Sequence, residues 1–141
     1  MTIHEIEEQI VEEFSIYDDW MDKYNYLIEM GKSLPLIDEK YKVENNLITG
    51  CQSRVWLNAE YKEGLITFSA DSDAVITKGI IFLLIRVMSG QKPDAIMKAS
   101  FEFIDKIGLR EHLSPTRSNG LSSMIKQIKL YAMAFKAKYG E

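Results

Sequence analysis

Apolar residues near the start of the chain recur every three or four positions, which is the spacing of one face of a helix. The pattern covers residues 3–14 and again residues 17–28, so we expect two amphipathic helices there. Thr2 and Glu5 have the spacing of a capping box for the first helix. Gly31 follows the second helix and is predicted to be its C′ residue.

The period changes to two in the middle of the chain. Residues 54–61 alternate apolar and polar side chains, and residues 65–70 are rich in residue types that favour strands. Glu63–Gly64 between them is typical of a turn, and residues 46–49 form a short candidate strand before them. We therefore predict a small antiparallel sheet of about three strands.

The second half of the chain is predominantly helical. Residues 74–89 are apolar nearly all round, which predicts a core helix that lies on the sheet. Residues 71–73 offer either capping side chains for it or carboxylates that contact a partner. Gly79 within it indicates close approach by a neighbouring backbone. Further helices are predicted from Pro93, over residues 101–107, and from Ser114 to about Tyr139. We expect one domain, residues 1–141, of the α+β class, with the helices packed over one face of the sheet.

Composition narrows the class of protein. The 141 residues are 46% apolar and 27% charged, which is typical of a folded globular domain. The net charge of −4 argues against nucleic acid as a partner. Residues 1–70 carry a net charge of −8 and residues 71–141 one of +4. This division indicates either two solvated faces of opposite sign or a polarised surface that orients a protein partner.

The sequence shows no pattern of an export signal or a membrane span. Acidic residues stand where an export signal would be basic, and the longest apolar run, residues 80–85, is far shorter than the span of about 20 residues that a membrane requires. We expect a cytoplasmic protein with no membrane partner. A single cysteine excludes an internal disulfide, and with only two histidines besides it no metal site is expected.

Cys51 is the residue whose placement packing explains least. It lies in a loop between two predicted strands, where reactive groups are commonly held. Gly50 gives this loop backbone freedom, and Gln52 and Ser53 bring hydrogen-bonding groups close to the sulfur. A free cysteine is also common as a small, inert, buried side chain. A reactive role requires positive charge or hydrogen-bond donors nearby, because an unperturbed thiol is mostly protonated at neutral pH.

Residues 111–120 form a second polar segment that opens the last predicted helix. Ser114 is suited to the N-cap position, with proline directly after it. Arg117 then lies in or near the first turn, where the helix dipole disfavours a cation, so it is either a plain surface arginine or one with a functional partner. His112 is interpreted as a hydrogen-bonded structural histidine rather than an acid or base.

Three separated motifs, in this order, resemble the SufE-type cysteine desulfuration proteins, which are sulfur acceptors in iron–sulfur cluster assembly. Residues 50–56, GCQSRVW, resemble the family signature GCQSxVW. Residues 71–79 contain the family's DSDA and KG, and residues 112–121, HLSPTRSNGL, resemble its HLxPxRSxGL stretch. The resemblance runs from about Glu13 to the last helix and implies a fold like those of SufE and IscU.

The resemblance also implies a function. Cys51 would accept sulfane sulfur as a persulfide from a pyridoxal-phosphate-dependent, SufS-like cysteine desulfurase, which the chain would stimulate. The sulfur would then pass to a SufB-like iron–sulfur scaffold. The chain would be a sulfur-transfer partner rather than a stand-alone enzyme, a monomer or weak homodimer, with no cofactor or metal of its own. The residues that would support the loop or dock the desulfurase are Gly50, Gln52, Ser53, Asp73 and Arg117.

Three other functions remain to be weighed. A cluster scaffold of related fold binds its cluster through several cysteines, and this chain has one. A cysteine hydrolase needs a histidine that activates the thiol, for which His112 is the candidate. A non-catalytic regulator would bind the desulfurase and would not need Cys51.

Access to the sulfur can also be predicted. A persulfide is easily reduced by small thiols, so a carrier benefits from sheltering it between encounters. Apolar strand residues flank the loop, and Gly50 can act as its hinge. We therefore expect the Cys51 thiol to lie in a mostly apolar hollow, with the rim near Asp73 and Arg117, and burial there to raise its pKa.

Overall fold

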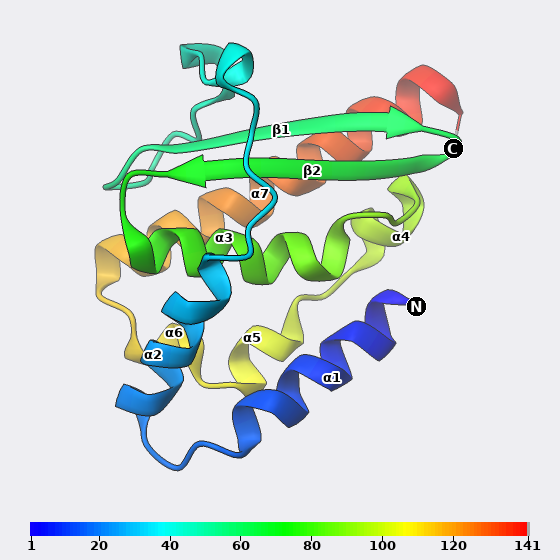
Figure 1. Ribbon diagram of the computed structural model, residues 1–141. Helices are drawn as coiled ribbons and strands as arrows, with labels where there is room; N and C mark the ends of the chain where they lie inside the picture. The colour runs from blue at the N-terminus through cyan, green and yellow to red at the C-terminus, as the bar shows by residue number, and fades with distance from the viewer. Residues whose placement is uncertain (141) are drawn as a thin grey trace.

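The computed structural model describes residues 1–140. It is built from α-helices, two 3₁₀ turns and one β-hairpin (Figure 1). The elements are α1 (Ile3–Ser15), α2 (Trp20–Gly31), η1 (Glu39–Tyr41), η2 (Glu44–Asn46), β1 (Val55–Lys62), β2 (Leu65–Ser72), α3 (Val75–Met88), α4 (Pro93–Lys98), α5 (Glu102–Lys106), α6 (Leu109–His112) and α7 (Pro115–Tyr139). This mixture of helices with a small antiparallel sheet confirms the predicted α+β class.

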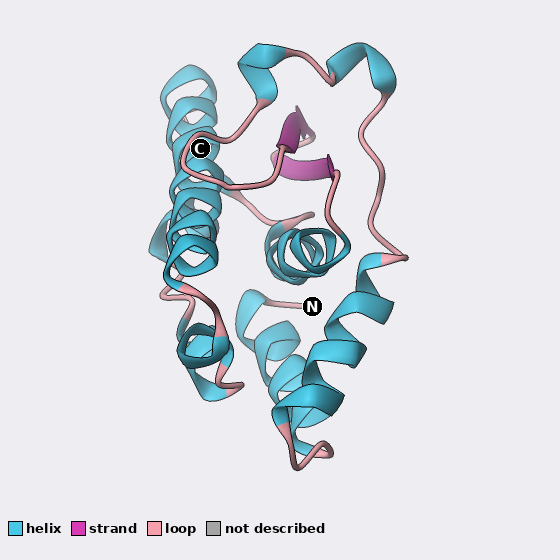
Figure 2. Ribbon diagram, turned by 90° about the vertical axis from the view of Figure 1, so that its left-hand side faces the viewer, coloured by secondary structure: helices cyan, strands magenta, loops and turns pink. Residues whose placement is uncertain are grey.

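The molecule is layered around α3. The hairpin lies on one side of this helix, and α1 and α2 lie on the other (Figures 1 and 2). Helix α7 runs along the flank of both α3 and the hairpin, and residues 35–47, here called the strap, arch over the outer side of the sheet (Figure 2). Most side chains of α3 are buried, as its apolar circumference predicts.

The sheet has two strands rather than about three. β1 and β2 pair antiparallel from Val55 opposite Ser72 to Lys62 opposite Leu65. Glu63 and Gly64 join them with positive φ angles of 54° and 83°, the conformation that a two-residue hairpin turn requires. The candidate strand at residues 46–49 makes only one isolated bridge to β1, because η2 and the following loop leave too short an extended segment between them.

Helices α2 and α3 cross in close contact. A Cβ built on Gly79 would overlap the carbonyl oxygen of Leu27, which confirms the predicted approach of a neighbouring backbone. A Cβ built on Gly31 would lie 2.8 Å from the backbone nitrogen of Gly79. The prediction that Gly31 is a C′ residue is therefore wrong. Gly31 is the last residue of α2, and its lack of a side chain serves the crossing.

The helix caps were predicted in part. The capping box of Thr2 and Glu5 is present, and Ser114 caps α7 by accepting a hydrogen bond from the backbone of Arg117. Helix α2 begins at Trp20, later than predicted, because Asp19 caps it. The prediction that residues 71–73 cap α3 is wrong, because no side chain accepts a hydrogen bond from the first turn of α3.

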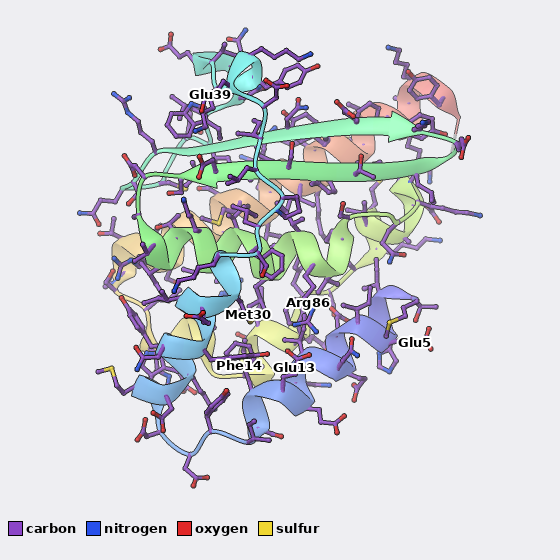
Figure 3. The ribbon with its side chains drawn as sticks, in the orientation of Figure 1. Glu5, Glu13, Phe14, Met30, Glu39 and Arg86 are labelled. Carbon is purple, nitrogen blue, oxygen red and sulfur yellow. The ribbon has the colours of Figure 1, made fainter. Side chains whose placement is uncertain are left out.

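A polar cluster ties the first helices to α3. Arg86 donates to both carboxylate oxygens of Glu13, at 2.8 Å and 2.5 Å, and the hydroxyl of Tyr26 donates to the same carboxylate. Figure 3 shows Arg86 and Glu13 facing each other between α3 and α1. Burial and the neighbouring carboxylate raise the pKa of Tyr26 to about 12. The cluster fixes α1 and α2 against the helix that carries part of the candidate site.

Candidate functional site

The Cys51 loop, residues 49–54, joins the strap to β1 and rests against α7. Gly50 has a φ of +89°, which residues with a side chain rarely adopt. A Cβ built there would also lie 2.5 Å from the Ser123 hydroxyl oxygen on α7. The backbone angle therefore requires glycine at position 50, whereas the Ser123 hydroxyl could rotate away from a side chain there.

The thiol of Cys51 is packed against the start of α7. It is half-buried, and its Sγ lies 3.6 Å from the carbonyl oxygen of Gly120, to which it donates. A Cβ built on Gly120 would lie 3.4 Å from this Sγ, which is an ordinary contact distance, so position 120 borders the sulfur directly. Burial raises the pKa of the Cys51 thiol, as predicted, and the resting sulfur is protonated at neutral pH.

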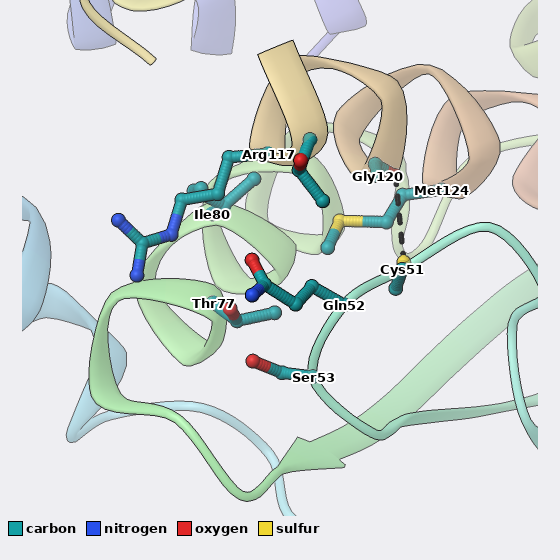
Figure 4. Close-up of a pocket in the computed structure, with 9 residues that line it drawn as sticks. Cys51, Gln52, Ser53, Thr77, Ile80, Arg117, Gly120 and Met124 are labelled. Atoms are coloured by element: carbon teal, nitrogen blue, oxygen red, sulfur yellow. Dashed lines mark hydrogen bonds between the residues drawn. The ribbon is translucent and has the colours of Figure 1, made fainter. Parts of the chain in front are cut away.

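A small hollow opens beside the thiol. Its volume of about 20 Å³ is space for about one water-sized atom. The larger part of its lining surface is apolar, as predicted, although five of its nine lining residues are polar. The first turns of α3 and α7 bring hydroxyl and guanidinium groups to it (Figure 4). The lining residues are Cys51, Gln52, Ser53, Thr77, Ile80, Thr116, Arg117, Gly120 and Met124.

Arg117 lies in the first turn of α7 and lines the hollow. Within residues 1–140 its guanidinium forms no ion pair or hydrogen bond. Figure 4 shows the side chain extending away from Cys51, toward the outside of the site. An arginine without a carboxylate partner, placed where the helix dipole disfavours it, is free to bind an anionic group of a partner.

Asp73 binds the end of the Cys51 loop and does not line the hollow. Its carboxylate accepts a hydrogen bond of 3.1 Å from the backbone of Arg54, and its own backbone N–H donates to the Arg54 carbonyl at 3.3 Å. Asp71, two residues earlier, is bound by Lys42 at 2.6 Å and Lys78 at 3.3 Å. Of the two carboxylates in this motif, only that of Asp73 therefore acts on the Cys51 loop.

His112 is not part of the site. Its ring stacks on Trp20 with 4.4 Å between ring centroids, and its Nδ1 lies 2.7 Å from the Gly108 carbonyl oxygen. It does not line the hollow. This position supports the interpretation of His112 as structural and leaves the thiol without a histidine base.

Five residues of the hollow were not predicted as site residues from the sequence: Thr77, Ile80, Thr116, Gly120 and Met124. A signal was present for two of them. Gly120 stands within the third motif, and Thr77 interrupts an otherwise apolar stretch. The others are residues of ordinary helix faces, and only the packing of α3 against α7 brings them to the thiol.

No metal site or membrane span is found in the part of the chain that the structure describes. Residues 1–140 contain no group of three histidine, cysteine or acidic side chains placed to hold a metal ion. None of their helices combines the length and the apolar character that crossing a membrane would need.

The chain is similar to known proteins over most of its length. Residues 8–132 match the family described as "SufE: Fe-S metabolism associated domain". An uncharacterized SufE-like protein of Rhizobium meliloti is 39% identical over 127 residues, which cover 86% of this chain and 91% of that protein. The Arabidopsis thaliana SufE-like protein 1, chloroplastic/mitochondrial, is 35% identical over 132 residues, 93% of this chain and 36% of that protein.

A solved structure has the same fold. The solution structure of a hypothetical protein from Thermus thermophilus superposes with a TM-score of 0.76. It is 21% identical in sequence, and the alignment covers 92% of this chain and 94% of that one. With the family match and the relatives at 35–39% identity, the sequence motifs and the fold lead to one conclusion: the chain belongs to the SufE family, which is associated with iron–sulfur metabolism.

Proposed function

We propose that this protein is a sulfur acceptor that carries sulfane sulfur as a persulfide on Cys51. The observation that carries the proposal is the thiol itself, which is half-buried beside a hollow of about one atom's size. A hollow of this size suits one added sulfur and is too small for an organic substrate. The family's association with iron–sulfur metabolism supports a role in supplying sulfur to clusters.

The transfer needs no oxidant. The Cys51 thiolate attacks the outer sulfur of a persulfide, Cys–S–SH, on a cysteine desulfurase. A new S–S bond forms on Cys51 as the donor's S–S bond breaks, and the donor cysteine leaves as a thiolate. The desulfurase supplies pyridoxal phosphate, which is the cofactor for removing sulfur from free cysteine. A scaffold thiol takes the sulfur from Cys51 by the same exchange.

The Cys51 loop would need two positions, one that shelters the sulfur and one that lets it react. In the resting position burial raises the thiol pKa, so the sulfur is a poor nucleophile. A desulfurase that binds only an outward position of the loop would draw the population toward it. Gly50 can serve as the hinge, because its backbone angles are accessible to glycine at little cost.

Two other functions are less well supported. A cysteine hydrolase requires a base beside the thiol, whereas His112 is stacked on Trp20 outside the hollow. A non-catalytic regulator would need no place for a sulfur atom. Neither function accounts for a hollow of about one atom's size beside the thiol.

The test measures cysteine turnover by a SufS-like desulfurase with and without this protein, and the mass of the recovered chain. The wild-type protein is expected to raise turnover and to gain one sulfur atom on Cys51. Cys51→Ser should give no stimulation, whereas His112→Ala should retain most of it, because His112 lies outside the hollow. Full stimulation by the serine variant would identify a regulator. Hydrolysis of a generic ester by the protein alone, lost in both variants, would identify a hydrolase.

A further inference from the structure

Thr77 is a buried polar residue whose hydroxyl has no partner. The residue is only 5% exposed, lies in the first turn of α3 and lines the Cys51 hollow. Within residues 1–140 its side chain makes no hydrogen bond, not even with the backbone at the start of its own helix. Buried hydroxyls are nearly always hydrogen-bonded to the protein or to water, so this one is available to a group that enters the hollow.

The hydroxyl oxygen of Thr77 is not sealed in the core. Among residues 1–140, the one fully enclosed side-chain oxygen or nitrogen without a partner is Oε2 of Glu7, in α1. Thr77 Oγ1 therefore reaches open space, and the hollow is the space that its residue lines. Figure 4 shows Thr77 between the side chains of Gln52 and Ser53, on the α3 side of the site.

We infer that Thr77 is the hydrogen-bond donor for the outer sulfur of the Cys51 persulfide. The inference rests on the proposed function, because it assigns a partner to the sulfur that Cys51 would carry. An S–S bond is about 2.05 Å long, so the outer sulfur would lie within the hollow next to Sγ. Because the hollow holds about one atom, that sulfur would contact the residues that line it, and Thr77 is one of them.

The hydrogen bond would act on the charged form of the persulfide. A hydroxyl that donates to an anion stabilises it, and this lowers the pKa of the group that carries the charge. Other residues with polar hydrogens also line the hollow, but they are exposed or half-buried, whereas Thr77 is buried: Gln52, Ser53, Thr116 and Arg117. Thr77 would thus hold the sulfur as a persulfide anion inside the closed site, whereas the burial that surrounds Cys51 opposes ionisation.

The experiment loads Cys51 without a desulfurase. The hydrogen disulfide anion, HS₂⁻, transfers one sulfur to the Cys51 thiolate and releases HS⁻, and mass spectrometry counts the sulfur gained. The rate at which iodoacetamide alkylates the persulfide is then measured against pH, to give its apparent pKa. The variants are Thr77→Val, which removes the hydroxyl at nearly constant shape, and Thr77→Ser, which keeps it. Thr67→Val is the matched control, because Thr67 is an exposed residue of β2 that does not line the hollow.

Thr77→Val is expected to raise the apparent pKa of the persulfide by about one pH unit. This shift corresponds to the free energy of one hydrogen bond to a charged group. Thr77→Ser should restore the wild-type value, and Thr67→Val should leave it unchanged. The alkylation profile of the unloaded thiol should be the same in all four proteins, because the hydroxyl would contact only the added sulfur.

Other results would overturn the inference. An unchanged persulfide pKa in Thr77→Val, or an equal shift of thiol and persulfide, would show that Thr77 only fills space. A wild-type thiol that iodoacetamide alkylates but HS₂⁻ cannot load would show that the hollow admits no sulfur. Because loading is chemical, a chain that passes this test yet does not stimulate a desulfurase would refute the proposed partner and leave the role of Thr77 standing.

Discussion

Gly120→Ala should separate the stability of the fold from the capacity to hold sulfur. Gly120 is buried within α7, at the wall of the Cys51 hollow. Alanine is favoured over glycine inside a helix by about 1 kcal/mol. The added Cβ would lie 3.4 Å from Cys51 Sγ, an ordinary contact that the resting thiol tolerates. The folded protein should therefore gain up to about 1 kcal/mol, or about 4 °C in Tm.

The persulfide should be affected in the opposite direction. The methyl group would take up much of the space of about 20 Å³ that the outer sulfur requires. Overpacking a site by about one such group costs about 1–3 kcal/mol, which corresponds to a shift of about 5- to 150-fold toward an outward loop. Sulfur on Cys51 would then be exposed to small thiols for a larger fraction of the time.

The assay measures both quantities on one preparation. Thermal unfolding gives the stability, and the release of sulfide by dithiothreitol from the loaded protein gives the lifetime of the persulfide. Ser122→Ala is the control, because Ser122 is an exposed residue of the same helix. We expect a persulfide lifetime at least about fivefold shorter in Gly120→Ala, without loss of stability, and unchanged in the control. A stabilised variant with a wild-type lifetime would refute the assignment of the hollow to the sulfur.

Three further predictions concern the loop and the fold. Asp73→Ala removes the carboxylate that accepts a hydrogen bond from the Arg54 backbone. Losing one hydrogen bond costs about 1 kcal/mol, so alkylation of Cys51 should become about fivefold faster. Asp73→Asn keeps an acceptor, and its alkylation rate should stay near that of the wild type. Because burial raises the Cys51 pKa, alkylation of the folded protein should reach half its maximal rate at a higher pH than in urea; coincident profiles would contradict this. Arg86→Met should destabilise the fold at neutral pH by about 3 kcal/mol, measured by urea unfolding, since it leaves the Glu13 carboxylate half-buried without its cation. The Arg86 guanidinium lowers the pKa of Glu13, so the pair's contribution is present above the ordinary Glu pKa of 4.5 and is lost as the pH falls through the lower, folded-state value. A deficit of Arg86→Met that stays constant down to pH 3 would disprove this account.

The parts of the fold that were predicted correctly depend on local patterns. The alternation in residues 54–61 gave β1, and the capping side chains of Thr2 and Ser114 marked true helix starts, because each acts within a few residues of itself. Gly31 shows where such reasoning fails. A glycine at the end of a helix usually indicates a C′ residue, and only the crossing partner, Gly79, explains it here.

The candidate site was predictable where one segment carries it. Residues 50–53 lie together in one loop, so their motif indicated the thiol and its neighbours. The opposite wall comes from α3 and α7, and helical periodicity assigned their side chains to the core. Asp71 was interpreted as a cap because nothing in the sequence relates it to Lys42 in the strap, which is 29 positions away. Sequence patterns cannot predict the contacts of polar groups whose partners are distant along the chain.

The contact between Gly31 and Gly79 also affects the width of the Cys51 hollow, because it sets the distance between α2 and α3. Gly79 faces α2, whereas Thr77 and Ile80, its near neighbours on the other side of α3, face the hollow. A side chain at either glycine would push α3 away from α2 and toward the Cys51 loop, so the hollow would narrow although none of its lining residues had changed. The capacity of the cavity is therefore adjustable from a position where no ligand is bound. A protein engineer could tune it through this helix crossing while leaving the reactive loop intact.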